Sequence, residues 1–110
     1  MPLHIFMDRL RHCRKTQHWP HDQVAHLFSD DLAQLKGFAL SVGLRLDWLQ
    51  WSDNGTPHFD LTPEMRTRAF LKGALEITDA DAATISGWWQ ARHMAVLKHL
   101  KRPRPFRVIA

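Results

Sequence analysis

The sequence predicts a small α/β domain in which four or five mostly parallel strands form one sheet, packed against about three helices. Short apolar runs alternate along the chain with longer segments whose apolar residues recur at helical spacing. Capping and turn residues separate these segments where helices and strands are expected to end. The chain has 110 residues and 45% hydrophobic content, which suits a single core. We therefore expect one domain over residues 1–100 and a basic C-terminal tail over residues 101–110.

The first half of the chain contains two expected strands and one helix. Its elements are, in order, a strand at 3–8, a polar loop at 9–22, a strand at 24–28 and a helix that ends at Gly43. Ser29, Asp30 and Asp31 precede that helix and offer side-chain oxygens to its free backbone N–H groups. Gly43 follows its last apolar residue, where glycine commonly ends a helix.

The second half continues the alternation. Its elements are, in order, a strand at 44–51, a turn at 52–57, a strand at 58–61, a helix at 62–73, a strand at 74–77 and a third helix that starts at 78 and ends at Pro103. Thr62 and Pro63 are a strong helix start, because threonine caps the helix and proline suits its first position. The apolar stripe of the third helix consists of Ile85, Trp89, Val96 and Leu100. Residues 106–109 form an edge strand or remain loose.

Composition and charge favour a particular cellular location and class of binding partner. A single cysteine, Cys13, excludes an internal disulfide and favours a cytoplasmic location. No stretch suits a signal peptide or a membrane span, so we expect no membrane contact. The net charge of +4 and the pI near 9.8 favour acidic partners, and the positive excess lies at 9–15 and 98–107. Nucleic acid is one candidate partner; the alternative is that both basic clusters are solvated surface.

Two short motifs place polar side chains where strands meet helices. Residues 26–31 and 58–63 each resemble a strand that runs into a capped helix start. His58 and Asp60 share one face of their strand, because side chains two residues apart point the same way. In a parallel sheet these side chains would converge beside two helix N-termini, which attract phosphate and carboxylate groups. The candidate catalytic residues are therefore His26, Asp30, His58 and Asp60.

Four further residues are candidates for holding the substrate, namely Asp8, Ser29, Thr62 and Arg66. Arg66 lies one helical turn after Thr62, so its guanidinium could clamp an anion there. Asp8 closes the first strand and projects to the same edge of the sheet. The simpler alternative is that the carboxylates and hydroxyls cap turns and helices, and that Arg66 forms a surface ion pair.

Cofactor and partners are open at this stage. A divalent metal is one alternative for His58 and Asp60, since imidazole and carboxylate suit zinc, manganese or iron. Four tryptophans, Trp48, Trp51, Trp88 and Trp89, suit either base stacking or a protein interface, including a homodimer.

An ordered set of short matches runs through the first two thirds of the chain. The matches are Asp8 after its strand, residues 26–30, Leu35, Phe38-Ala39, Gly43-Leu44, residues 48–50, residues 58–62, Arg66 and residues 73–76. In this set the chain resembles a family of small bacterial and phage proteins catalogued as domain of unknown function 4031. The resemblance implies that Asp8, His26, Asp30, His58, Asp60 and Arg66 occupy the family's polar motif positions, and it implies no established activity. The chain departs from the family pattern at Gln34 and Lys36, where an acidic residue and a histidine are common, and at Phe59, where tyrosine is usual.

Two functions compete. The first is a small hydrolase or transferase that acts on a phosphate-bearing substrate, a nucleotide or a nucleic-acid end, through a histidine and a carboxylate as acid and base. The alternative is a non-catalytic binding module, or a phage-type accessory or inhibitor protein, that binds protein or nucleic acid through its third helix and basic tail. We favour the enzyme, because polar strand ends at two helix starts are hard to explain as packing alone.

Overall fold

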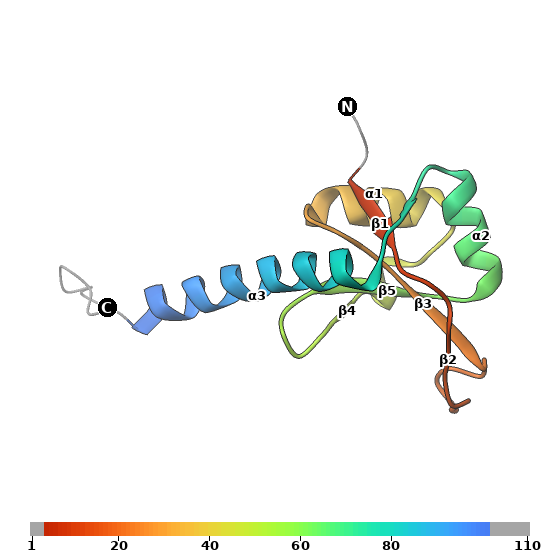
Figure 1. Ribbon diagram of the computed structural model, residues 1–110, viewed down its shortest axis with the longest axis horizontal. Coiled ribbons are helices and arrows are strands. Elements are labelled where there is room, and N and C mark those ends of the chain that lie inside the picture. The colour runs from red at the N-terminus through yellow and green to blue at the C-terminus, as the bar shows by residue number, and fades with distance from the viewer. Residues whose placement is uncertain (1–3, 102–110) are drawn as a thin grey trace.

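The strands form one mixed sheet in the computed structural model, which describes residues 4–101 (Figure 1). The strands are β1 (Ile5–Met7), β2 (Arg11–His12), β3 (Gln23–Ser29), β4 (Gln50–Trp51), β5 (Pro57–Leu61) and β6 (Leu75–Glu76). The helices are α1 (Leu32–Ser41), the 3₁₀ turn η1 (Leu46–Trp48), α2 (Pro63–Leu71) and α3 (Asp79–Lys101). The sheet order is β4-β5-β3-β1-β6, and β2 pairs with β3.

The prediction of a mostly parallel sheet is wrong, because only β1 and β6 pair in parallel. Residues 9–22 were expected to be a loop, but they include β2 and return the chain beside β1 in the opposite direction. A second reversal comes from the turn after β4, which leads back as β5 and lays it antiparallel to β3. The α/β class and the three helices agree with the sequence, whereas the pairing sense depends on these two reversals.

One face of the sheet carries the hydrophobic core. Side chains from alternate positions of β3 and β5 are fully buried there against α1 and α2. The central members are Ala25, Leu27, Phe59, Leu61, Leu35, Phe38, Ala39 and Ala69. Because side chains alternate along a strand, the residues between them point to the opposite face of the sheet.

Local capping chemistry sets the ends of α1 and α2. Asp31 Oδ1 accepts a hydrogen bond from Gln34 N at 2.9 Å, and Thr62 Oγ1 accepts one from Met65 N at 3.2 Å. These bonds satisfy N–H groups that have no partner within the helix. Gly43 follows α1 with φ of 91°, a conformation that side-chain-bearing residues rarely adopt.

The predicted strand at 44–51 is wrong over most of its length. Residues 46–48 form η1, and only Gln50–Trp51 pairs in the sheet. Leu44 is buried, but Leu46 and Trp48 are 43% and 50% exposed. The alternation in this segment therefore does not correspond to one buried strand face.

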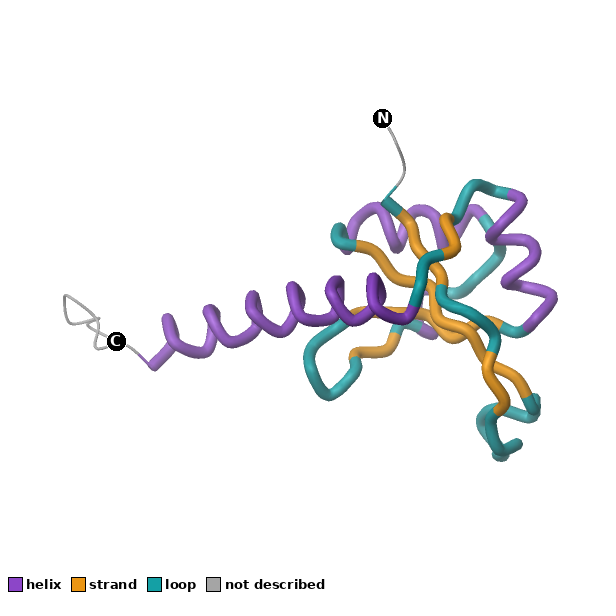
Figure 2. Tube along the Cα trace, viewed as in Figure 1, coloured by secondary structure: helices purple, strands orange, loops and turns teal. Residues whose placement is uncertain are grey.

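Helix α3 crosses the face of the sheet opposite the core and then extends away from it (Figure 2). The indole of Trp89 is buried, and its Nε1 donates a hydrogen bond to the carbonyl of Ser29 at 2.7 Å. Of the predicted stripe, Ile85 is partly buried, whereas Val96 is 56% exposed. The expected edge strand at 106–109 lies outside the described residues. Over residues 4–101, no helix combines the length and the apolar character that crossing a bilayer requires.

Candidate functional site

Three polar side chains meet on the face of the sheet opposite the core. His26 of β3 lies directly across from Asp60 of β5 in the antiparallel register, and His58 lies two residues before Asp60 on the same face. Asp60 Oδ1 is 3.6 Å from His26 Nε2 and 3.7 Å from His58 Nε2. The two imidazole rings are edge to face with centroids 5.3 Å apart. We call these three residues the His–Asp cluster.

Asp8 orients the first imidazole of the cluster. Its carboxylate is buried and accepts hydrogen bonds from His26 Nδ1 at 2.8 Å and from His26 N at 2.6 Å. A carboxylate only accepts, so Nδ1 carries the proton and Nε2 faces Asp60. The pairing of β1 with β3 brings the end of β1 to this point.

The other two members of the cluster also have outer partners. His58 Nδ1 lies 3.1 Å from the carbonyl oxygen of Thr56, which fixes the proton on Nδ1 and leaves Nε2 with a lone pair. Gln50 Nε2 donates to Asp60 Oδ2 at 2.9 Å, so Oδ1 is the oxygen turned toward the imidazoles. Each side chain of the cluster is thus held at one polar atom and presents another to a shared point.

The contact between Asp8 and His26 shifts both pKa values. Burial raises the pKa of Asp8, but the hydrogen bonds from the His26 side chain and backbone and the charges of His26 and Arg11 bring it below its ordinary value. The hydrogen bond to Asp8 raises the pKa of His26; burial lowers it, the charges of Asp8 and Asp60 raise it, and the charge of Arg11 lowers it. The net pKa of His26 lies above its ordinary value, because its contacts with Asp8 and Asp60 favour the charged imidazole more than burial and Arg11 oppose it.

The cluster has the ligand types and spacing of a three-ligand metal site. One nitrogen from each histidine and one oxygen of Asp60 all lie within 4.8 Å of one another. Two atoms that bind a tetrahedral metal at about 2.1 Å are about 3.4 Å apart, close to the distances from Asp60 to the two imidazoles. Two histidines and one carboxylate suit zinc, iron or manganese, and three protein ligands leave positions open for water or substrate.

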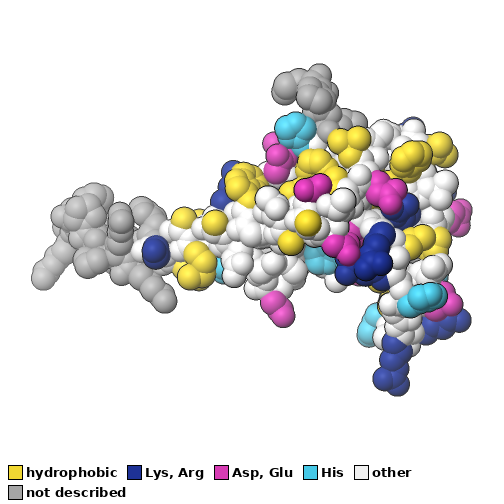
Figure 3. Space-filling view, in the orientation of Figure 1, with side chains coloured by type: hydrophobic (Ala, Val, Ile, Leu, Met, Phe, Trp, Pro, Cys, Tyr) yellow, Lys and Arg dark blue, Asp and Glu magenta, His cyan; other side chains and the backbone are white. Residues whose placement is uncertain are grey.

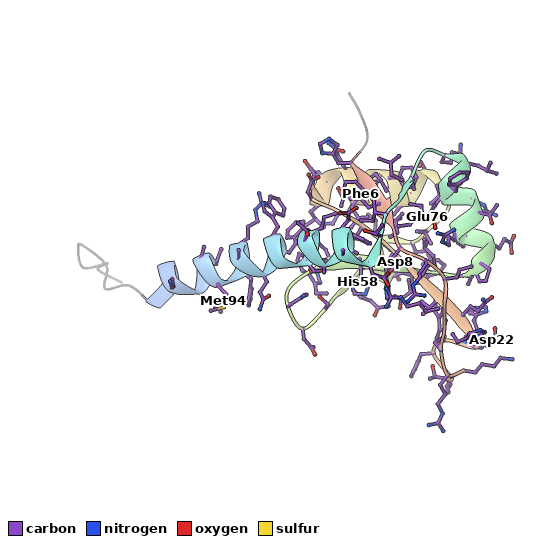
Figure 4. The ribbon with its side chains drawn as sticks, viewed as in Figure 1. Phe6, Asp8, Asp22, His58, Glu76 and Met94 are labelled. Atoms are coloured by element: carbon purple, nitrogen blue, oxygen red, sulfur yellow. The ribbon has the colours of Figure 1, made fainter. Side chains whose placement is uncertain are left out.

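A cavity of about 270 Å³ borders the two histidines of the cluster, whereas Asp60 lines a separate cavity of about 530 Å³. The floor of the smaller cavity includes Asp8, His26 and His58, and Ala82 and Ser86 of α3 form part of its wall. Figure 4 labels Asp8 and His58, which lie close together beside the first turns of α3. A small substrate can therefore approach the two histidines between the sheet and α3.

A cation borders the cluster. Arg11 Nη2 lies 3.8 Å from Asp8 Oδ2 and 2.7 Å from Asp79 Oδ1, and the Arg11 side chain is partly exposed. Arg9 also pairs with Asp79, at 3.2 Å. Positive charge is thus present beside the two imidazoles, where an anionic group would be stabilised.

The structure brings together Asp8, His26, His58 and Asp60 from the predicted site and places Ser29, Asp30 and Thr62 elsewhere. Ser29 is buried, with its Oγ donating to the His4 carbonyl, and Asp30 Oδ2 is 3.2 Å from His4 Nδ1. Thr62 caps α2. The expectation that the two helix N-termini meet is wrong, because antiparallel β3 and β5 end at opposite ends of the sheet.

Arg66 contacts the end of β1 rather than an open anion site. Its Nε donates to the Asp8 carbonyl at 3.0 Å, and its Nη2 lies 3.1 Å from Glu76 Oε1. Arg66 thereby ties α2 to β1 and β6 directly behind the residue that orients His26.

The sequence did not identify Gln50 and Thr56 as the hydrogen-bond partners of Asp60 and His58. Gln50 faces His58 across the β4–β5 pair, and Thr56 acts through its backbone carbonyl. The turn residues at 52–57 indicated a reversal, and a hairpin prediction at that point would have placed Gln50 beside the site. A backbone acceptor leaves no trace in side-chain identity, so the role of Thr56 had no sequence signal.

Comparison with known proteins gives one family. The family model described as "Protein of unknown function (DUF4031)" matches residues 5–89. No curated protein and no solved structure gives a significant match. The matched segment includes the whole His–Asp cluster and Asp8, and it ends at Trp89 within α3.

Proposed function

The chain belongs to this family of unknown function, and we propose that it is a small metal-dependent hydrolase or transferase that acts on a phosphate-bearing substrate at the His–Asp cluster. The observation that carries the proposal is that all three ligand candidates are held by outer partners. Asp8 holds His26, the Thr56 carbonyl holds His58, and Gln50 holds Asp60. Such outer partners orient the ligands of metal sites and fix the tautomers of their imidazoles.

The chemistry of the pocket supports a reaction rather than a closed structural site. Structural zinc sites have four protein ligands, whereas three ligands leave a position for water. A bound divalent metal would lower the pKa of that water toward about 7 and polarise a phosphoryl oxygen. Arg11, which pairs with Asp8 and Asp79, is a cation beside the residue that orients His26.

The proposed reaction is the hydrolysis of a phosphate ester. In this reaction the oxygen of a water would form a bond to phosphorus, the P–O bond to the leaving group would break, and the proton that the water gives up would balance the one that the leaving oxygen takes up. In the transferase form an alcohol takes the place of water. His26 and His58 would hold the metal through Nε2, while Asp8 accepts the Nδ1 hydrogen bond of His26 and keeps that ring from turning.

The test is phosphodiesterase activity with and without added metal. We expect protein freed of metal by chelation to be inactive toward bis(p-nitrophenyl) phosphate, and zinc, manganese or cobalt to restore turnover. His58→Ala and Asp60→Asn should lower kcat/KM by about 100-fold or more, as expected when a ligand is lost. Folding of each variant is checked by circular dichroism.

Asp30→Asn is the matched control. Asp30 is a partly exposed carboxylate that pairs with His4 just before α1, away from the cluster. We expect this variant to keep wild-type activity. Full activity after chelation, or an equal loss in Asp30→Asn and Asp60→Asn, would contradict the proposal.

A further inference from the structure

A groove continues from the His–Asp cluster along α3. Ala82 and Ser86 line the cavity at the cluster, and His93 and Val96, on the same side of the helix, line a second cavity of about 810 Å³. Ser52, at the start of the β4–β5 turn, lines both cavities. The two cavities are therefore neighbouring parts of one groove between α3 and the β4–β5 hairpin.

The hairpin and the helix meet at Gly55. A Cβ added to Gly55 would lie 3.4 Å from the Cβ of His93, so the backbone of the turn packs directly against α3. About 10 Å of helical rise separates Ser86 from His93. A ligand that occupies both cavities is therefore longer than a single phosphate ester group.

The groove contains an exposed aromatic surface with a fixed support. Trp51 lies on the hairpin and is 55% exposed, and its ring meets Trp89 edge to face at 6.3 Å. Trp89 is buried and anchored through its bond to the Ser29 carbonyl. An exposed indole in a groove is a stacking surface for a flat ring such as a nucleobase.

The charge along this part of the chain suits a polyanion. After Asp81 the sequence has no acidic residue up to its last residue, 110, whereas it has six lysines and arginines. Arg92 lines the groove, with its guanidinium 3.9 Å from the ring centre of Trp88. Figure 3 shows hydrophobic and basic side chains on the visible face of the projecting part of α3. Asp53, on the hairpin, is the one carboxylate among the residues that line the second cavity.

We propose that this groove binds single-stranded nucleic acid, with bases stacked on Trp51 and phosphates at Arg92, and that it leads the strand to the His–Asp cluster. The proposal rests on the proposed function for the reaction, but strand binding itself does not require the metal. Stacking tolerates any base, so we expect little sequence preference. Lost phosphate contacts change the salt dependence of binding, which separates a strand from an apolar partner.

Fluorescence anisotropy of a labelled oligothymidylate with the full, metal-free chain tests the proposal. We expect Trp51→Leu to weaken binding roughly 5- to 150-fold, the effect of losing one stacked base. Arg92→Ala should weaken binding and reduce the slope of log K against log salt by about one. Phe70→Leu is the matched control, because Phe70 is 56% exposed on α2 and lines neither cavity of the groove.

Asp60→Asn separates this proposal from the proposed function, because Asp60 is a ligand candidate of the cluster but lines neither cavity of the groove. We expect that variant to bind the oligonucleotide like the wild type while losing phosphodiesterase activity. If the oligonucleotide binds in a Trp51-dependent way but no form of the protein hydrolyses the phosphate ester, the proposed enzyme activity is wrong and the proposed groove is supported. Metal-dependent hydrolysis of the small ester without Trp51-dependent strand binding would overturn the groove.

Two further results would also overturn the proposal of a strand-binding groove. One is an equal loss of binding in Phe70→Leu and Trp51→Leu. The other is a dimer, measured by sedimentation, that dissociates in Trp51→Leu, because a second copy would then occupy the groove.

Discussion

Replacing Asp8 with asparagine should weaken metal binding although Asp8 is not itself a ligand. Its two carboxylate oxygens accept hydrogen bonds from the backbone nitrogen of His26 at 2.6 Å and from His26 Nδ1 at 2.8 Å. Only 5% of Asp8 is exposed. Asparagine keeps one acceptor and replaces the other with an N–H₂ group. The ring then loses one bond or moves its proton to Nε2, the atom that must bind the metal.

These contacts determine how much metal affinity and stability Asp8→Asn should lose. Loss of an outer-shell partner typically lowers metal affinity 10- to 100-fold, which corresponds to about 1.4–2.7 kcal/mol. The metal-free fold should also lose stability, by about 1.5–3 kcal/mol for a charge-assisted hydrogen bond. The lower end is expected, because asparagine escapes the cost of burying a charge.

Isothermal titration calorimetry of zinc or cobalt into metal-free protein measures the change in affinity. Asp79→Asn is the matched control, since it removes the same charge from the same patch. Asp79 is half exposed and, among residues 4–101, forms ion pairs with Arg9 and Arg11. We expect the control to bind like the wild type. Unchanged affinity in Asp8→Asn, or an equal loss in both variants, would refute the role assigned to Asp8.

Three further predictions concern stability. The pKa of Asp8 is lowered and that of His26 is raised, so their contact stabilises the metal-free protein fully between about pH 3.9 and 6.5. The free energy of unfolding in urea should therefore be higher for the wild type than for Asp8→Asn within this range. The difference should decline as pH rises through the folded-state pKa of His26 or falls through that of Asp8. A constant difference from pH 3 to 9 would contradict this. Phe59→Ala should lower the free energy of unfolding by about 3–5 kcal/mol, because Phe59 is fully buried on the core face, and a loss below 1 kcal/mol would show that the core is assigned wrongly. Thr62→Ala should cost about 1 kcal/mol in the same urea assay, whereas no loss would remove its role as the cap of α2.

Local features of the sequence were predicted best. The caps at Asp31 and Thr62 depend on a few neighbouring residues, and both occur in the structure. The shared face of His58 and Asp60 follows from the two-residue period of a strand, which holds for parallel and antiparallel pairing alike. These predictions did not require knowledge of the rest of the fold.

Non-local pairing explains what the sequence analysis missed. Asp30 directly follows β3, and Asp60 lies near the end of β5. Only the antiparallel register of β3 and β5 places Asp60 beside His26 and leaves Asp30 at the far end of the sheet. The role of Asp8 depends on β1 lying beside β3, which the polar segment between them does not reveal. Long-range pairing of this kind is decided by packing of the whole sheet and leaves little trace in any short segment.

A crystal soaked with zinc and measured at the zinc absorption edge tests the central claim most directly. We predict one anomalous peak per chain at about 2.0–2.2 Å from Nε2 of His26, Nε2 of His58 and an oxygen of Asp60, with Asp8 still bonded to His26. A fully occupied zinc elsewhere on the chain, with the His–Asp cluster empty, would contradict the account.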